Sequence, residues 1–152
     1  MKRFFFSLLS AAVLGMVISG IAAAQVKPEI LVKQRQSAMT LQGKYFGPMA
    51  GMAQGKIPYS AEVVTRNAGY LEVLSKMPWD GFNPSTKDVK SAALPAVYSD
   101  AAKFREAQDR FQSEASKLAS MVKGGDEGAI KQQILAVGKT CGGCHENFRE
   151  KQ

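Results

Sequence analysis

The sequence contains few of the residues from which metal sites and catalytic sites are usually built. Its 152 residues include two cysteines, one histidine and one tryptophan. A structural zinc site takes four protein ligands, and two thiolates with one imidazole do not supply them. No run of lysine or arginine is longer than two residues, and basic residues alternate with acidic ones. This pattern indicates a solvated surface and does not favour nucleic acid as a partner.

The sequence also lacks sustained β alternation, internal repeats and low-complexity tracts. Apolar residues instead recur at spacings of three, four and seven, which is typical of amphipathic helices. We predict an all-α fold, an antiparallel four-helix bundle with two short connections and one long one. The predicted helices run from about Pro28 to Met49, from Ser60 to before Pro78, from Ser99-Asp100 to Gly124-Gly125, and from Asp126 through Phe148.

Proline sets two further expectations. Gly47-Pro48 should end or kink the first helix, because the residue before a proline avoids helical angles. Residues 78–97 hold three of the six prolines and few periodic positions. We therefore expect a long loop there, and a loop of that length in a compact domain is usually functional or wraps around something.

The N-terminus is typical of a secretory leader. Lys2-Arg3 precedes an apolar run, and Ala22-Ala23-Ala24 matches a signal-peptidase site with cleavage before Gln25. The alternative is an uncleaved membrane anchor, but the run is barely long enough to span a bilayer. We predict a cleaved signal peptide at 1–24 and one domain at 25–152, located in the periplasm without stable membrane association. Loss of the leader lowers the net charge from +7 to +5.

Both cysteines and the only histidine of the sequence lie in Cys141-Gly-Gly-Cys144-His145. A disulfide there would close a very short loop and stabilise little, and no strand precedes it as in thioredoxin-like redox sites. The spacing C-x-x-C-H is the attachment signature of haem c. Two thiols add to two vinyl groups, and the next histidine supplies a nitrogen to the iron. We predict covalent haem c on the C-terminal helix.

Four segments, in order along the chain, resemble one known family. They are R-Q-S-A-M-T-L at 35–41, M-P-W-D-G-F at 77–82, Y-S-D-A-A-K-F at 98–104 and C-G-G-C-H-E-N-F-R at 141–149. Together they resemble the class II cytochromes c, the cytochrome c-prime family, over the whole of residues 25–152. The resemblance implies a four-helix bundle with one haem c, ligated through its iron by His145.

The resemblance also implies roles on the first helix. Arg35 matches an arginine that reaches a haem propionate, and Gln36 matches a position close to the haem. A charge on the same stripe as Val32 and Met39 needs a partner in any case. The alternative is an arginine at the edge of the stripe whose charged end reaches water.

The role of Met39 determines which of two coordination states the iron has. In the family its position lies over the distal side of the haem, where it is either an apolar plug above five-coordinate iron or a sixth ligand. Arg149 matches a basic residue at the proximal pocket, with stabilisation of a helix end as the alternative. Trp79 and Phe82 are expected at the haem periphery or in ordinary core, and the loop from Phe82 to Pro95 should cover one haem edge.

We therefore predict a haem protein that binds nitric oxide or carbon monoxide and exchanges one electron with unidentified redox proteins. The alternative is a six-coordinate electron carrier with Met39 as sixth ligand, and a haem-free helical module is a further class. An enzyme is not expected, because the sole histidine is occupied and no paired-carboxylate motif stands out. The resemblance also implies a homodimer packed through the first two helices.

Overall fold

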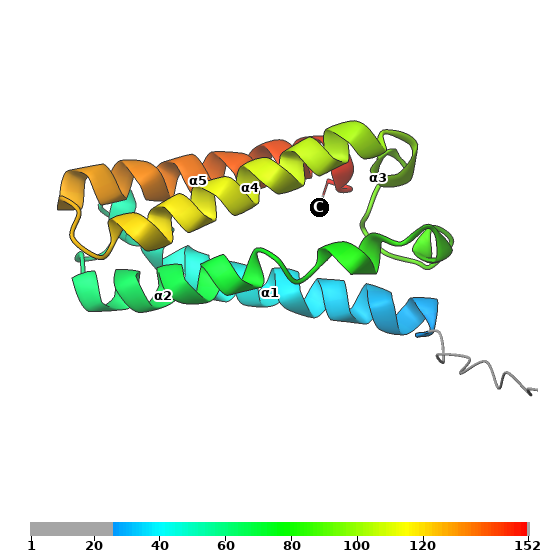
Figure 1. Ribbon diagram of the computed structural model, residues 1–152, viewed down its shortest axis with the longest axis horizontal. Helices are drawn as coiled ribbons and strands as arrows, with labels where there is room; N and C mark the ends of the chain where they lie inside the picture. Colours follow the sequence, from blue (N-terminus) through cyan, green and yellow to red (C-terminus); the bar gives the residue numbers. More distant parts are fainter. Residues whose placement is uncertain (1–25, 152) are drawn as a thin grey trace, which may run out of the picture.

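The computed structural model describes residues 26–151, so the predicted leader lies outside the described residues. Four long helices run antiparallel in two layers, one of α1 and α2 and one of α4 and α5 (Figure 1). The predicted four-helix bundle is confirmed. None of the helices in the described part is long and apolar enough to cross a membrane. The elements are α1 (Pro28–Ala53), α2 (Ala61–Leu74), η1 (Trp79–Phe82), η2 (Pro84–Thr86), α3 (Ala96–Ser99), α4 (Ala101–Met121) and α5 (Glu127–Phe148).

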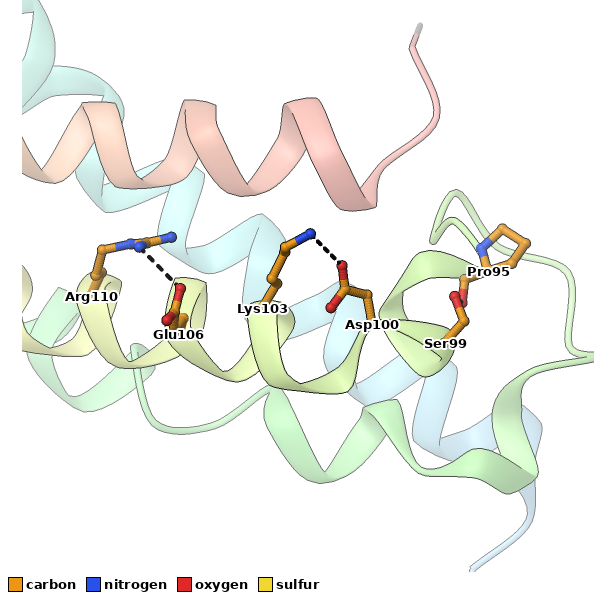
Figure 2. A network of polar contacts seen from close by, with 6 residues as sticks. All are labelled: Pro95, Ser99, Asp100, Lys103, Glu106 and Arg110. Carbon is orange, nitrogen blue, oxygen red and sulfur yellow. Dashed lines mark hydrogen bonds and ion pairs between the residues drawn. The ribbon is translucent and has the colours of Figure 1, made fainter.

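The helices begin where the sequence places capping residues. Ser60 accepts a hydrogen bond from the Val63 N–H at 3.4 Å, and Asp126 accepts one from the Ala129 N–H at 2.9 Å. Asp100 precedes α4 as expected but makes no capping bond. Its carboxylate pairs with Lys103 at 3.1 Å instead (Figure 2). This pair is exposed, so it contributes little to stability.

Gly47-Pro48 was expected to end or kink the first helix, and of these two outcomes the ending is wrong, because α1 continues to Ala53 with Pro48 inside it. Proline removes one backbone donor from the helix, at a cost of about 3 kcal/mol. The turn after it carries Met49 and Met52, which are 0% and 6% exposed within the main core. Their burial offsets the missing hydrogen bond, since tertiary packing supplies most of a helix's stability.

The core has two clusters. The main cluster draws on all four long helices, and the second one, at the end of the bundle where α5 finishes, contains Val97, Phe104 and Phe148. Phe104 packs edge-on against Phe82 at 4.8 Å and against Phe148 at 5.2 Å between ring centroids. Trp79 packs against both clusters. The second cluster thus joins the 78–97 segment to α4 and α5.

The segment predicted as a long loop contains η1, η2 and α3. Its start is anchored by Trp79, whose indole N–H donates to the Ser75 carbonyl at 2.6 Å. Gly81 then lies directly against α1. A Cβ at this position would meet the Arg35 Cβ at 2.7 Å and the Leu31 carbonyl oxygen at 2.9 Å. A glycine is therefore needed for the segment to approach α1 this closely.

Replacing Gly81 by alanine is expected to destabilise the protein by about 1–3 kcal/mol, because the added methyl forces the segment away from α1. Urea or thermal unfolding measures the change. Gly69→Ala is the matched control, since a Cβ at Gly69 in α2 meets nothing within 4 Å. That variant should gain roughly 0.5–1 kcal/mol from helix propensity. Equal stabilities of the two variants would contradict the close contact.

Candidate haem site

A cavity of about 540 Å³ lies between α1, the 78–97 segment and the end of α5. The start of α1 and the end of α5 share one end of the bundle (Figure 1). Arg35, Gln36, Met39, Cys144 and His145 all border this cavity, so residues a hundred positions apart meet there. Thr40, Phe82, Ser91, Ala92, Ala93, Phe104, Phe148 and Arg149 complete the lining.

The two cysteines lie on successive turns near the end of α5 and are both free thiols. Cys141 packs against the main core, whereas Cys144 packs against the second cluster and borders the cavity. Burial, and next the neighbouring Cys144, raise the pKa of Cys141 to about 11, and burial also raises the pKa of Cys144. Reactive redox dithiols have lowered pKa values, so this environment does not favour a thioredoxin-like dithiol.

No cluster of three or more metal-ligating Cys, His, Asp or Glu side chains occurs in residues 26–151. His145 projects from the last turn of α5 and borders the cavity. Partial burial, followed by the positive charge of Arg149, lowers the pKa of His145. At neutral pH the imidazole is therefore uncharged, which is the form that ligates metals.

Arg149 borders the cavity from just beyond α5, where its extended backbone forms the C-cap. Its backbone N–H donates to the His145 carbonyl at 3.2 Å. The adjoining residues fasten the chain end to the 78–97 segment. The Leu94 N–H donates to the Phe148 carbonyl at 3.0 Å, and the Glu150 N–H donates to the Ala92 carbonyl at 2.9 Å. One wall of the cavity is thus tied to the helix that carries His145.

Arg35 is 3% exposed, so the alternative of an edge arginine reaching water is wrong. Its Nη1 donates to the Gly81 carbonyl at 2.6 Å, and its guanidinium lies 4.4 Å from the centre of the Phe82 ring. Nη1 also reaches the hydroxyls of Thr86 at 3.1 Å and Tyr98 at 3.3 Å, and Nη2 donates to Ser91 at 2.8 Å. All these partners are neutral.

The Arg35 guanidinium still has N–H donors available for a charged partner. The ion pairs found among the described residues join other side chains, so this buried charge has hydrogen bonds but no carboxylate there. A guanidinium has five N–H donors, and the bonds above use Nη1 and one N–H of Nη2. A carboxylate inside the cavity would fit both the charge and the remaining donors.

The walls of the cavity also fit a flat apolar macrocycle. Phe82, Phe104 and Phe148 line it, with a thiol and a neutral imidazole on α5. The segment from Phe82 to Pro95 contributes Phe82, Ser91, Ala92 and Ala93 to the lining, and its cover of one haem edge stays a prediction. Trp79 is not among the lining residues, and its contacts are those of core. The residues present therefore fit haem c.

Sequence reasoning missed three polar residues that shape this site, namely Thr86, Ser91 and Tyr98. Thr86 is 1% exposed although it lies in a segment that holds three of the six prolines, where no periodicity marks a buried position. Tyr98 opens the Y-S-D-A-A-K-F motif, and the motif by itself predicts no contact for it. An aromatic residue with a hydroxyl beside a helix start was the one available signal.

Comparisons with known proteins agree with this geometry. The family model described as Cytochrome C' matches residues 31–149. The cytochrome c' of Rubrivivax gelatinosus is 44% identical over 126 residues, which cover 82% of this chain and 98% of that protein. The crystal structure of the cytochrome c' from that organism superposes with a TM-score of 0.78 at 42% identity, covering 82% of this chain and 98% of the other.

A second relative was solved with a gas bound. The cytochrome c prime of Alcaligenes xylosoxidans, as the nitric oxide complex of a leucine-to-alanine mutant, superposes with a TM-score of 0.77 at 38% identity. That match covers 84% of this chain and 99% of the other. With a family match over most of the described helices and a cavity that fits the cofactor, this chain belongs to the cytochrome c′ family of haem c proteins.

Proposed function

We propose that this chain is a periplasmic haem c protein that binds small diatomic gases, nitric oxide or carbon monoxide, and exchanges one electron at a time. The supporting observation is the cavity shared by Cys144 and His145 on α5 and by Arg35 and Met39 on α1. The nitric oxide complex of the Alcaligenes relative supports the choice of gas.

When bound, the haem supplies an iron that changes between ferrous and ferric states and takes up diatomic ligands. Cys141 and Cys144 are the tethers, and their spacing along α5 matches the two vinyl positions of one haem edge. His145 offers an uncharged ring nitrogen as the axial ligand. Arg35 is the partner of a haem propionate, because it is a buried cation facing the cavity with unused donors.

Met39 is the distal plug in this proposal. It is half-buried and borders the cavity from α1, whereas His145 borders it from α5. The exposed side chain of Gln36 lies one residue after Arg35 at the edge of the same cavity. Met39 contributes an apolar thioether to a cavity that three phenylalanines also line, and this apolar lining would favour uncharged diatomic ligands over charged ones. Arg149 also borders the cavity and is joined to His145 by a backbone hydrogen bond, so in this proposal it is the basic residue of the proximal pocket.

A second candidate function is supported by the same position of Met39. The Met39 thioether borders the cavity from α1 while His145 borders it from α5, and if both held the iron the protein would be a six-coordinate electron-transfer cytochrome. We favour the five-coordinate gas binder because a structure from the family holds nitric oxide.

The spectrum of the reduced protein with and without carbon monoxide separates the two functions. We expect the gas to change the spectrum, and Met39→Ala to increase the affinity for carbon monoxide about tenfold, which corresponds to roughly 1.4 kcal/mol of steric cost. Met77→Ala, which removes an exposed methionine, is the control and should leave the affinity unchanged. A wild-type spectrum that carbon monoxide does not alter, with a gas response only in Met39→Ala, would assign Met39 as a ligand.

Export and assembly complete the proposal. The segment 1–24 is the signal peptide, and the mature protein isolated from the periplasm should begin at Gln25, which intact-mass measurement tests. Redox proteins are the proposed partners, and no catalytic role is proposed. A homodimer is the proposed assembly, and the exposed apolar side chains of Leu41 on α1 and Val73 on α2 agree with it.

A further inference from the structure

A cluster of hydroxyl groups surrounds Arg35 and has no part in the function proposed so far. We propose that Tyr98 and Thr86 are positioning residues, whose hydroxyls hold the Arg35 guanidinium at the cavity wall and thereby raise the reduction potential of the haem. This inference rests on the proposed function, because it assumes a haem in the cavity. It concerns residues that lie outside the haem attachment motif and outside α1.

The hydrogen bonds of the cluster have a defined direction. Thr86 has one hydroxyl hydrogen, and its shortest contact is with the Asn83 carbonyl at 2.7 Å, to which it donates. The Thr86 oxygen can then only accept, and it lies 2.9 Å from the Tyr98 hydroxyl. Tyr98 therefore donates to Thr86. Nη1 of Arg35 has two N–H groups, and one of them donates to the Gly81 carbonyl at 2.6 Å. The lone pairs that remain on the Thr86 and Tyr98 oxygens, at 3.1 Å and 3.3 Å from Nη1, share the other.

This arrangement anchors the cation from several elements at once. Arg35 belongs to α1, whereas its acceptors are Gly81 on η1, Thr86 on η2, Tyr98 on α3 and Ser91 between the last two. A free arginine side chain populates many rotamers and loses this freedom when its guanidinium is held. Its four acceptor residues restrict this freedom. The position of the charge therefore depends on residues 46 to 63 positions further along the chain.

A fixed and buried cation has a direct electrostatic consequence for an iron in the same cavity. Its charge is poorly screened, because burial lowers the effective dielectric constant. Ferric haem carries one more positive charge than ferrous haem, so a nearby cation disfavours oxidation and raises the reduction potential. A guanidinium that moves away, or fluctuates over several positions, has a weaker effect. Loss of a positioning hydroxyl should therefore lower the potential.

Tyr98→Phe tests this with little disturbance of packing, because it keeps the ring and removes only the hydroxyl. In the haem-loaded protein we expect the ferric-to-ferrous ratio at a fixed applied potential to rise about threefold, a fall of roughly 30 mV for a one-electron couple. Thr86→Val should change the potential in the same direction. Spectroelectrochemical titration measures both. Tyr70→Phe, which removes an exposed hydroxyl from α2, is the matched control and should leave the potential unchanged.

The double variant Arg35→Met, Tyr98→Phe distinguishes an effect of Tyr98 on the position of the Arg35 guanidinium from a general loosening of the surrounding structure. If Tyr98 acts through Arg35, Tyr98→Phe causes no further shift once the cation is absent. Hydrogen–deuterium exchange of residues 79–98 gives a second readout, and it should be faster in Tyr98→Phe than in Tyr70→Phe. A potential that Tyr98→Phe does not change, or changes equally with and without Arg35, overturns the proposal.

The single-variant comparison of Tyr98→Phe with Tyr70→Phe decides the matter even if Arg35→Met does not fold. Haem staining on a denaturing gel tests the proposed function separately. A chain that carries haem but shows no Tyr98-dependent shift overturns only the positioning of Arg35. A chain that carries no haem overturns both proposals.

Discussion

Replacing His145 by alanine should leave the haem attached but remove its axial nitrogen. The sequence has no second histidine, so no other imidazole can take its place. Axial ligands set the potentials of haem proteins over a range of about 0.8 V, and we expect a shift on the order of 100 mV or more. The visible spectrum should change with it. Added free imidazole should restore much of the original spectrum, because the missing ligand is a small neutral ring.

The neighbouring variant Glu146→Ala is the matched control for this experiment. Glu146 is the next residue of α5, is exposed and does not border the cavity. Its removal should change neither the spectrum nor the potential, and haem staining should be equal in both variants. If His145→Ala had the wild-type spectrum, the axial ligand would have to be another residue, and the proposed site would be wrong.

Replacing both cysteines by serine should abolish covalent attachment completely. Thioether bonds are the reason that haem c survives denaturation, and a hydroxyl does not form them. On a denaturing gel the Cys141→Ser, Cys144→Ser double variant should therefore show no haem stain. Each single variant keeps one thiol and should retain part of the stain. The difference in haem stain between the two single variants reports the environments of the two thiols, because Cys144 borders the cavity and Cys141 packs against the main core.

Gly142→Ser and Gly143→Ser provide controls within the same helical turn. A Cβ at either glycine meets nothing within 4 Å, so the added hydroxymethyl group has room. These variants introduce the same side chain as the cysteine replacements but keep both thiols, and they should stain fully. Full haem staining of the double cysteine variant would contradict covalent attachment through Cys141 and Cys144.

Much of the fold followed from local patterns. Apolar residues recurring at spacings of three and four predicted amphipathic helices, and on α5 the residues that follow this spacing, Ile130, Ile134 and Val137, are all buried. Ser60 and Asp126 marked helix starts because capping acts within one turn. Pro48 misled the sequence reasoning because its local cost is outweighed by the burial of Met49, a contact between elements that no local pattern reveals.

One wall of the site was determined by the sequence alone. Two thiols and an imidazole within five positions are brought together by the covalent chain and one helical turn, so they need no tertiary contact to be recognised. The other walls were decided only by the tertiary structure. Arg35 finds its hydrogen-bond acceptors 46 to 63 positions away, in a segment without helical periodicity. Hydrogen bonds between hydroxyls, carbonyls and a guanidinium depend on distances of about 3 Å, and such distances are set by how the helices pack.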